Sequence, residues 1–158
     1  IKITDAISAN KVYKVKDNLP YIDILKLNLI EAEALLKHQL DDDAKIVAAL
    51  RTLKAKGSKE VLITTRNGAF LASDKIYYFE HDAYDKDVKN TTGAGDAFLA
   101  AYTYASKNNF DVNKRVCFAL AQAVLTVRSI ETVAPLTVQD VESFMQECHF
   151  KGAILYNF

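Results

Sequence analysis

The chain has few cysteines, no excess of charge of either sign and no long hydrophobic run, and each shortage excludes a class of protein. Cys117 and Cys148 are the two cysteines, and without CxxC spacing they predict neither a disulfide framework nor a zinc site; we expect both in helices as small buried side chains. Lys plus Arg number 20 and Asp plus Glu number 20, so no nucleic-acid or membrane partner is indicated. No run approaches the roughly 18 apolar residues of a membrane span, and no signal peptide opens the chain. We therefore expect a soluble cytoplasmic protein.

At 158 residues, half of them hydrophobic, the chain fits one domain with a sizeable core. We expect residues 1–158 to form a single domain. Because the first residue is Ile1 and not Met, we expect a processed chain or a fragment.

Runs with the apolar density of strands alternate with runs of helical spacing, which predicts an α/β domain with mostly parallel strands. The expected strands are 21–27, 61–65, 69–73 and 76–79. The expected helices are 3–19 (a short helix closed by Pro20), 32–40, 44–56, the run from 97 to 105, 116–127 and 138–149. In this architecture ligands bind beyond the carboxyl ends of the strands.

The stretch from Asn90 to Asp96 (NTTGAGD) precedes an apolar helical run. A helix start presents unpaired backbone N–H groups and partial positive charge, and glycines let an anion approach the backbone closely. Asp96 in the first turn could accept a proton from an alcohol beside a bound phosphate. This layout suits phosphoryl transfer. The alternative is that Gly93-Ala94-Gly95 is only a turn and Asp96 only caps the helix.

Asn28 and Glu31 also have two interpretations. Their spacing at a helix start is that of a capping box, which is a complete structural explanation. The functional alternative is that both face a ligand at the end of a strand. Two acidic stretches, Asp41-Asp42-Asp43 and the set between Glu80 and Asp87 that includes Asp85, are expected to be solvated and not to bind metal.

Three nucleotide-binding signatures fail on the sequence. The dinucleotide pattern GxGxxG would need glycine at position 98, where Phe98 stands. The phosphate-loop pattern GxxxxGK[ST] is absent, and so are the protein-kinase motifs. A dinucleotide-dependent oxidoreductase, a P-loop NTPase and a protein kinase are therefore excluded.

Three stretches in the same order resemble the ribokinase-like (PfkB) carbohydrate and nucleoside kinases. They are the TTGAGDAF run from Thr91 to Phe98, the Asn-x-x-Glu motif at Asn28 and Glu31, and Val61-Leu62-Ile63-Thr64 with Gly68 after it. The resemblance implies a three-layer α/β/α fold, of which this chain is the C-terminal half. It also implies an ATP-dependent phosphotransferase that acts on a sugar or nucleoside hydroxyl. Within the family, the stretches 4–27 and 132–137 look most like pseudouridine kinases.

By position, the resemblance implies a role for each motif residue. Asp96 would be the catalytic base, with Gly93, Ala94 and Gly95 as the anion hole for the transferring phosphoryl group. Asn28 and Glu31 would organise Mg²⁺ and phosphate, partly through water. Residues expected near the nucleotide are Thr64, Thr92, Ala121 and Gln122.

Departures from the family pattern leave alternatives open. Many members have Asp at the position of Asn90, which is associated with a monovalent-cation site, so a role for K⁺ stays open. The Thr-Leu-Gly turn of the family appears as Thr64-Thr65-Arg66, one residue shorter before Gly68. A ribokinase- or fructokinase-like sugar kinase, a homodimer, and a non-catalytic half that binds nucleotide or a partner chain remain alternatives.

Overall fold

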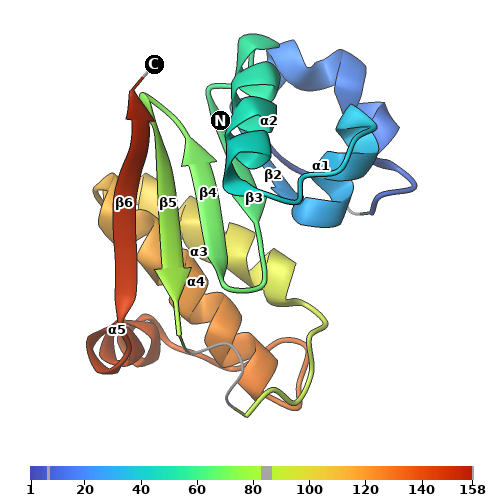
Figure 1. Ribbon diagram of the computed structural model, residues 1–158. Coiled ribbons are helices and arrows are strands. Elements are labelled where there is room, and N and C mark those ends of the chain that lie inside the picture. The colour runs from blue at the N-terminus through green and yellow to red at the C-terminus, as the bar shows by residue number, and fades with distance from the viewer. Residues whose placement is uncertain (7, 83–86, 158) are drawn as a thin grey trace. The chain divides into compact units, whose positions relative to one another are not determined.

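The computed structural model describes residues 1–6, 8–82 and 87–157, and the side chains of 154–157 are not described. Asp85 of the acidic set therefore lies outside the described residues. The elements along the chain (Figure 1) are β1 (Ile3–Asp5), the 3-10 helix η1 (Val12–Tyr21), β2 (Ile24–Asn28), α1 (Leu29–Leu36), α2 (Asp43–Ala55), β3 (Glu60–Thr64), β4 (Gly68–Ala72), β5 (Lys75–His81), α3 (Ala94–Lys107), α4 (Val112–Arg128), α5 (Val138–Glu147) and β6 (Phe150–Asn157).

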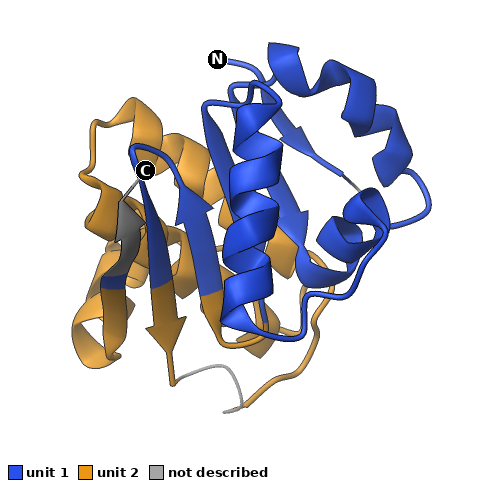
Figure 2. Ribbon diagram, turned by 45° about the horizontal axis from the view of Figure 1, so that its top comes forward, with its two compact units in different colours: residues 1–65, 69–78, 153–158 blue, residues 66–68, 79–152 orange. Residues whose placement is uncertain are grey.

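The chain divides into two compact units (Figure 2). The first comprises residues 1–65, 69–78 and 153–158, and the second comprises 66–68 and 79–152. The expectation of one domain over 1–158 stays a prediction, and so does the three-layer arrangement.

The strands form a mixed sheet, which corrects the expectation of mostly parallel strands. The six strands follow one another in the order β1-β2-β3-β4-β5-β6. β1 pairs with β2 and β2 with β3 in parallel, whereas β3 and β4 are antiparallel. The three-residue connection at 65–67 joins neighbours, and so short a loop can only turn the chain back as a hairpin. Parallel pairing would need a crossover of a dozen or more residues.

The core of the first unit lies on one face of its sheet. Leu25 and Leu27 of β2 and Ile63 of β3 are 0% exposed and pack with apolar side chains of η1, α1 and α2. Because side chains alternate along a strand, Lys26 and Asn28 point to the opposite face. The residues with chemistry at the end of β2 are thus held by an apolar core behind them.

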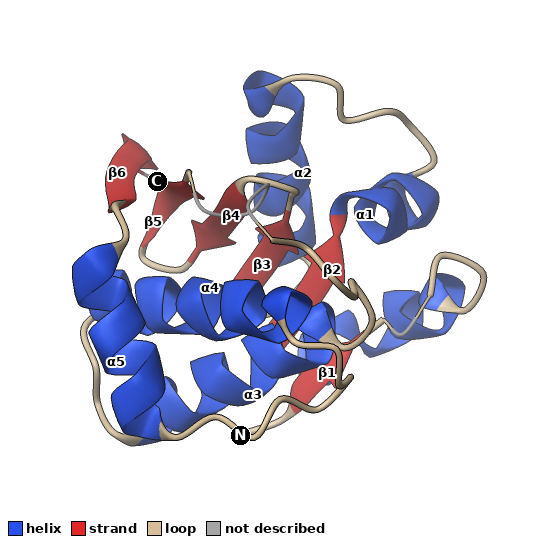
Figure 3. Cartoon of the chain, turned by 90° about the horizontal axis from the view of Figure 1, so that it is seen from below, coloured by secondary structure: helices blue, strands red, loops and turns tan. Residues whose placement is uncertain are grey.

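The second unit is built on α3 and α4, which lie side by side (Figure 3). Phe98 and Tyr102 of α3 are buried and stack at a centroid distance of 6.2 Å, and Tyr104 stacks on Phe118 of α4 at 5.8 Å. Cys117 is buried as expected, and burial raises the pKa of its thiol to about 11. A thiol with that pKa stays protonated near neutral pH and serves as a small apolar side chain.

Four features near the termini differ from the expectations. Residues 3–5 are a strand and not the start of a helix, because β1 finds a parallel partner in β2 that the local sequence does not reveal. Pro20 lies inside η1 and does not close it. At the other end, Cys148 follows α5 with extended backbone, and the expected helix to His149 stops at Glu147. No strand was expected where β6 lies. The remaining expected strands and helices are confirmed within a few residues.

Within the described residues, no helix is long and apolar enough to cross a membrane. In the same residues, no group of three or more His, Cys, Asp or Glu side chains is placed to hold a metal ion.

Candidate active site

The start of α3 differs from the start of every other α-helix in the described part of the chain. The helices α1, α2, α4 and α5 each begin at a side chain that accepts a hydrogen bond from the first turn; these side chains are Asn28, Asp42, Asp111 and Thr137. The N-cap of α3 is Gly93, which has no side chain to do so. The first helical bond runs from Ala97 N–H to the Gly93 carbonyl at 2.8 Å. The N–H groups of residues 93–96 therefore remain as donors for an anion.

Gly93 is required by the backbone. Its φ of 85° lies in the left-handed region, which side chains with a Cβ adopt at a cost. A Cβ there would lie 2.6 Å from the Thr132 carbonyl oxygen. The glycine thus allows both the turn into α3 and the close approach of the loop that carries Thr132.

Asp96 does not cap α3. It is the third residue of the helix, it is exposed, and its carboxylate makes no hydrogen bond or ion pair within the part of the chain that the structure describes. The capping alternative raised from the sequence therefore does not explain Asp96. Its position in the first turn still gives the carboxylate a favourable interaction with the helix dipole.

A cavity of about 410 Å³ in the second unit connects the start of α3 to α4. Gly93 and Asp96 line it at one end, and Gln122 of α4 lines it as well. Apolar and aromatic side chains make up most of the remaining wall; among them are Ala97, Ala100, Tyr104, Phe118, Val133 and Leu136. The structure thus brings together three residues singled out from the sequence. Ala121, also expected near the nucleotide, is 0% exposed and is not among the residues that line this cavity.

The sequence did not single out Tyr104 and Phe118 as cavity residues. Tyr104 lies eight positions after Asp96, so the two share one face of α3, and this spacing was the available signal. Nothing in the local sequence indicates that Phe118 faces the same space.

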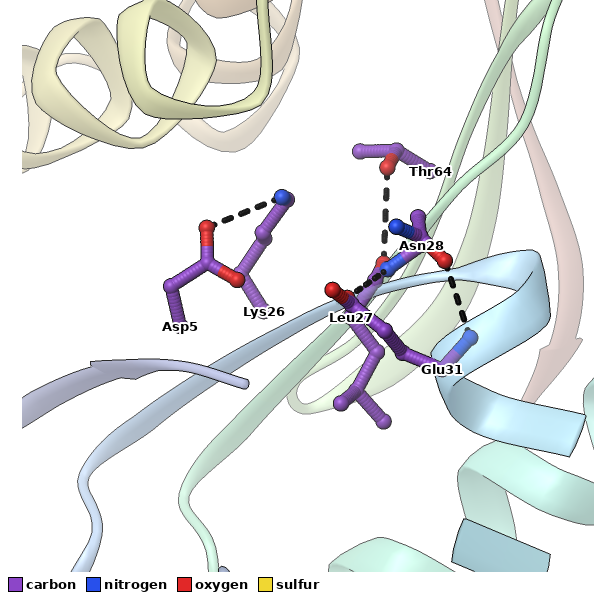
Figure 4. Close-up of polar contacts among 6 residues, drawn as sticks. All are labelled: Asp5, Lys26, Leu27, Asn28, Glu31 and Thr64. Atoms are coloured by element: carbon purple, nitrogen blue, oxygen red, sulfur yellow. Dashed lines mark hydrogen bonds and ion pairs between the residues drawn. The ribbon is translucent and has the colours of Figure 1, made fainter. Parts of the chain in front are cut away.

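The first unit holds the Asn-x-x-Glu pair at the carboxyl end of β2 (Figure 4). Asn28 Oδ1 accepts a hydrogen bond from Glu31 N–H, and Glu31 Oε2 accepts one from Asn28 N–H, both at 2.8 Å. The capping box is therefore real. It uses only one carboxylate oxygen of Glu31, and Oε1 has no hydrogen-bond partner among the described residues. A side chain that is only 4% exposed is thus fixed in place with one oxygen still able to bind.

Asn28 shares its sheet face with three other polar residues (Figure 4). Thr64 is its register partner on β3 and donates from Oγ1 to the Leu27 carbonyl at 3.4 Å. Lys26 is 4% exposed, and its ammonium lies 2.9 Å from the carboxylate of Asp5, its register partner on β1. Asp5 and Lys26 were not expected at the site, although a lysine within the apolar run of β2 was an available signal.

Asn90 and Thr92 lie in the loop before α3. Asn90 Oδ1 accepts a hydrogen bond from Thr92 N–H at 2.9 Å, so the two fix the shape of this loop. Thr92 is exposed to solvent and Asn90 is half-buried.

The capping role of Asn28 can be tested separately from the binding role that the sequence suggests. Asn28→Ala is expected to lower the free energy of unfolding by about 1 kcal/mol, because it removes the N-cap acceptor of α1. Asn28→Ser keeps a capping oxygen and should retain most of the stability. Urea unfolding of the three proteins measures this. Equal stability of the alanine and wild-type proteins would show that the capping box contributes nothing.

Comparison with known proteins agrees with this arrangement. The sequence profile of the family described as pfkB family carbohydrate kinase matches residues 3–139. A 1-phosphofructokinase from Haemophilus influenzae is 29% identical over 105 residues, which are 66% of this chain and 34% of that protein. A bifunctional protein HldE from Aliarcobacter butzleri is 27% identical over 127 residues, which are 77% of this chain and 25% of that protein.

Solved structures of carbohydrate kinases also resemble this chain. A protein from Clostridium perfringens, provisionally described as a sugar kinase, superposes with a TM-score of 0.91 at 27% identity and covers 99% of this chain and 49% of its own. Ribokinase of Arabidopsis thaliana, solved with ribose and ATP, gives a TM-score of 0.75 at 25% identity over 91% of this chain and 47% of its own. The chain thus spans about half of these structures, and its matches span about a third and a quarter of the two curated relatives. This chain belongs to the pfkB family of carbohydrate kinases.

Proposed function

We propose that this chain carries the ATP-binding and catalytic half of a kinase that phosphorylates a hydroxyl of a sugar or nucleoside. The observation that supports this most is the start of α3, where the backbone donors of residues 93–96 lie beside an Asp96 carboxylate that has no partner among the described residues. The donors suit a phosphoryl group, and the carboxylate suits the proton of an attacking hydroxyl. The other α-helices in the described part of the chain begin at a capping side chain, which α3 lacks.

In the proposed reaction, the Asp96 carboxylate accepts the proton of the acceptor hydroxyl while the hydroxyl oxygen bonds to the γ-phosphorus of ATP. The bond from that phosphorus to the β–γ bridging oxygen breaks, and ADP leaves with the electron pair. Backbone N–H groups at Gly93, Ala94 and Gly95 stabilise the charge on the transferring phosphoryl oxygens. Each of these roles uses a group that has no partner among the residues the structure describes.

Mg²⁺ is proposed to be held by the first unit. Glu31 has a carboxylate oxygen to offer, and Mg²⁺ is commonly bound through one or two carboxylates and several waters. Asn28 orients Glu31 and would contribute through water. When bound, the ion neutralises charge on the nucleotide phosphates. Thr64, Thr92 and Gln122 are proposed as nucleotide contacts, and Gln122 adds a polar group to the largely apolar cavity.

The acceptor is proposed by similarity. Ribose and ATP are bound in the Arabidopsis thaliana ribokinase structure, and a sugar hydroxyl with ATP is the corresponding pair for this chain. Pseudouridine is our finer proposal, on the resemblance of stretches 4–27 and 132–137. Ribose and fructose are the alternatives.

A second candidate function is a non-catalytic half that binds nucleotide or pairs with another chain. The observation that favours it is the coverage of 49% and 47% of the two related structures. The two candidates share the nucleotide site and differ in turnover.

Titration calorimetry of this chain with ATP and Mg²⁺ tests the shared part of both proposals. We expect one saturable site whose affinity falls when EDTA removes Mg²⁺, and Asn28→Ser should weaken binding although its stability is retained. Heat changes equal to those of buffer, at protein concentrations where the chain is folded, would refute nucleotide binding by this chain.

A further inference from the structure

The loop before the anion hole is attached to the last turn of α4 and to the segment that follows it, and all of these residues belong to the second unit. Lys89 N–H and Asn90 N–H both donate to the Val127 carbonyl, at 2.8 and 3.1 Å. Asn90 Nδ2 donates to the Ile130 carbonyl at 3.4 Å. Gly93 lies so close to Thr132 that a Cβ would reach its carbonyl oxygen at 2.6 Å. The position of the anion hole therefore depends on segment 127–132.

The orientation of the Asn90 amide is fixed by its neighbours. Thr92 N–H is a donor and must face the amide oxygen, which it does at 2.9 Å. The amide nitrogen then faces the Ile130 carbonyl, an acceptor. If the amide were reversed, its NH₂ group would face the Thr92 N–H donor and its oxygen would face the Ile130 carbonyl. Only the observed orientation therefore satisfies both contacts.

This arrangement does not suit a monovalent cation at Asn90. Hard cations bind oxygen ligands, and here an N–H group already points at the carbonyl oxygen that a cation would need. An aspartate at the same position would have no donor. Its carboxylate would face the Ile130 carbonyl with like partial charges together, and a cation between the two oxygens would relieve this repulsion.

We propose that Asn90 is a positioning residue whose side-chain amide replaces a monovalent cation between the anion-hole loop and segment 127–132. Nucleotide binding by this chain then needs no K⁺. This inference rests on the proposed function for its nucleotide readout, whereas the attachment itself can be measured without nucleotide.

The test compares wild type, Asn90→Asp and Asn90→Ala in KCl and in tetramethylammonium chloride at equal ionic strength. Wild type should show the same ATP affinity and the same unfolding temperature in both salts. Asn90→Asp should lose about tenfold in ATP affinity in tetramethylammonium chloride, together with a lower unfolding temperature, and K⁺ should restore both. Asn90→Ala should show the losses without restoration, because it offers no oxygen to the cation.

Asn108→Asp is the matched control. Asn108 also donates from Nδ2 to a backbone carbonyl, that of Tyr104 at 2.8 Å, at the opposite end of α3. It receives the same change of charge, and any loss of stability should be equal in the two salts. A K⁺-specific recovery in this variant would mean that the salt effect is not particular to Asn90.

Three results would overturn the inference. Wild type could gain ATP affinity or unfolding temperature specifically from K⁺, Asn90→Asp could behave as wild type in both salts, or its losses could persist in K⁺. Absence of ATP binding in every protein, with the expected unfolding temperatures, would instead refute the proposed function and leave the attachment supported.

Discussion

Asp96→Asn is expected to lower turnover of the active enzyme by roughly a hundred- to ten-thousand-fold while the Kd for ATP changes little. The carboxylate is exposed, lies on the cavity wall and makes no hydrogen bond or ion pair with a described residue, so its loss should not disturb the structure. A base acts only in the transition state, and the amide cannot accept the proton. Steady-state rates and ATP titrations of both proteins measure the two quantities.

The matched control for this substitution is Asp43→Asn. Asp43 is also an exposed carboxylate in the first turn of a helix, α2, and it does not line the cavity beside Asp96. The same loss of one charge at a helix start should leave turnover unchanged. Near wild-type turnover in Asp96→Asn, or an equal fall in both variants, would remove Asp96 from the role of base.

Gly93→Ala should lower the free energy of unfolding by more than about 2 kcal/mol and abolish measurable ATP binding. The backbone at Gly93 has a φ of 85°, and the new Cβ would lie 2.6 Å from a backbone oxygen that cannot move without segment 127–132. Both effects shift the backbone donors at the start of α3. Urea unfolding and ATP titration test them together.

Gly95→Ala separates stability from binding. Gly95 lies inside α3 and is not among the glycines with positive φ, so alanine fits the helix and should retain or slightly raise stability. Its Cβ would still obstruct the approach of a phosphate to the backbone, and ATP affinity should fall. Wild-type stability in Gly93→Ala would show that the left-handed turn and the contact with Thr132 are not required.

Much of the fold could be predicted because strong local signals agree with it. The β3 run is buried at its three central residues, α2 has its expected cap region, and α4 is buried on most sides, as their apolar patterns indicate. The strand β1 could not be predicted, since it depends on pairing with β2, 21 positions along the chain. Propensity carries little information about such partners. The antiparallel direction of β4 did have a local signal, the short connection after β3.

The candidate site could likewise be predicted only in part from the sequence. The glycines, Asp96 and the Asn28–Glu31 pair could be found from motif spacing alone. The sequence could not show that the Asp96 carboxylate has no partner among the described residues, or that the capping box uses only one carboxylate oxygen of Glu31. Both facts depend on the three-dimensional structure. The ion pair of Asp5 with Lys26 and the bond of Asn90 to Ile130 join residues 21 and 40 positions apart, and no local pattern indicates either.

Phosphorylation of an acceptor with ATP and Mg²⁺ tests the central claim most directly, and ³¹P NMR of the products follows it. The proteins are this chain and the full-length protein that contains it, with Asp96→Asn as the blank. The acceptors are pseudouridine, ribose, fructose and the common nucleosides. We predict that the full-length protein forms ADP and a phosphate ester of one acceptor, and that the blank forms neither. If this chain then binds ATP without turnover, it is the catalytic half without its acceptor site. Two results would contradict the account. One is ester formation that persists in the blank, and the other is the absence of an ester with every acceptor when the full-length protein binds ATP.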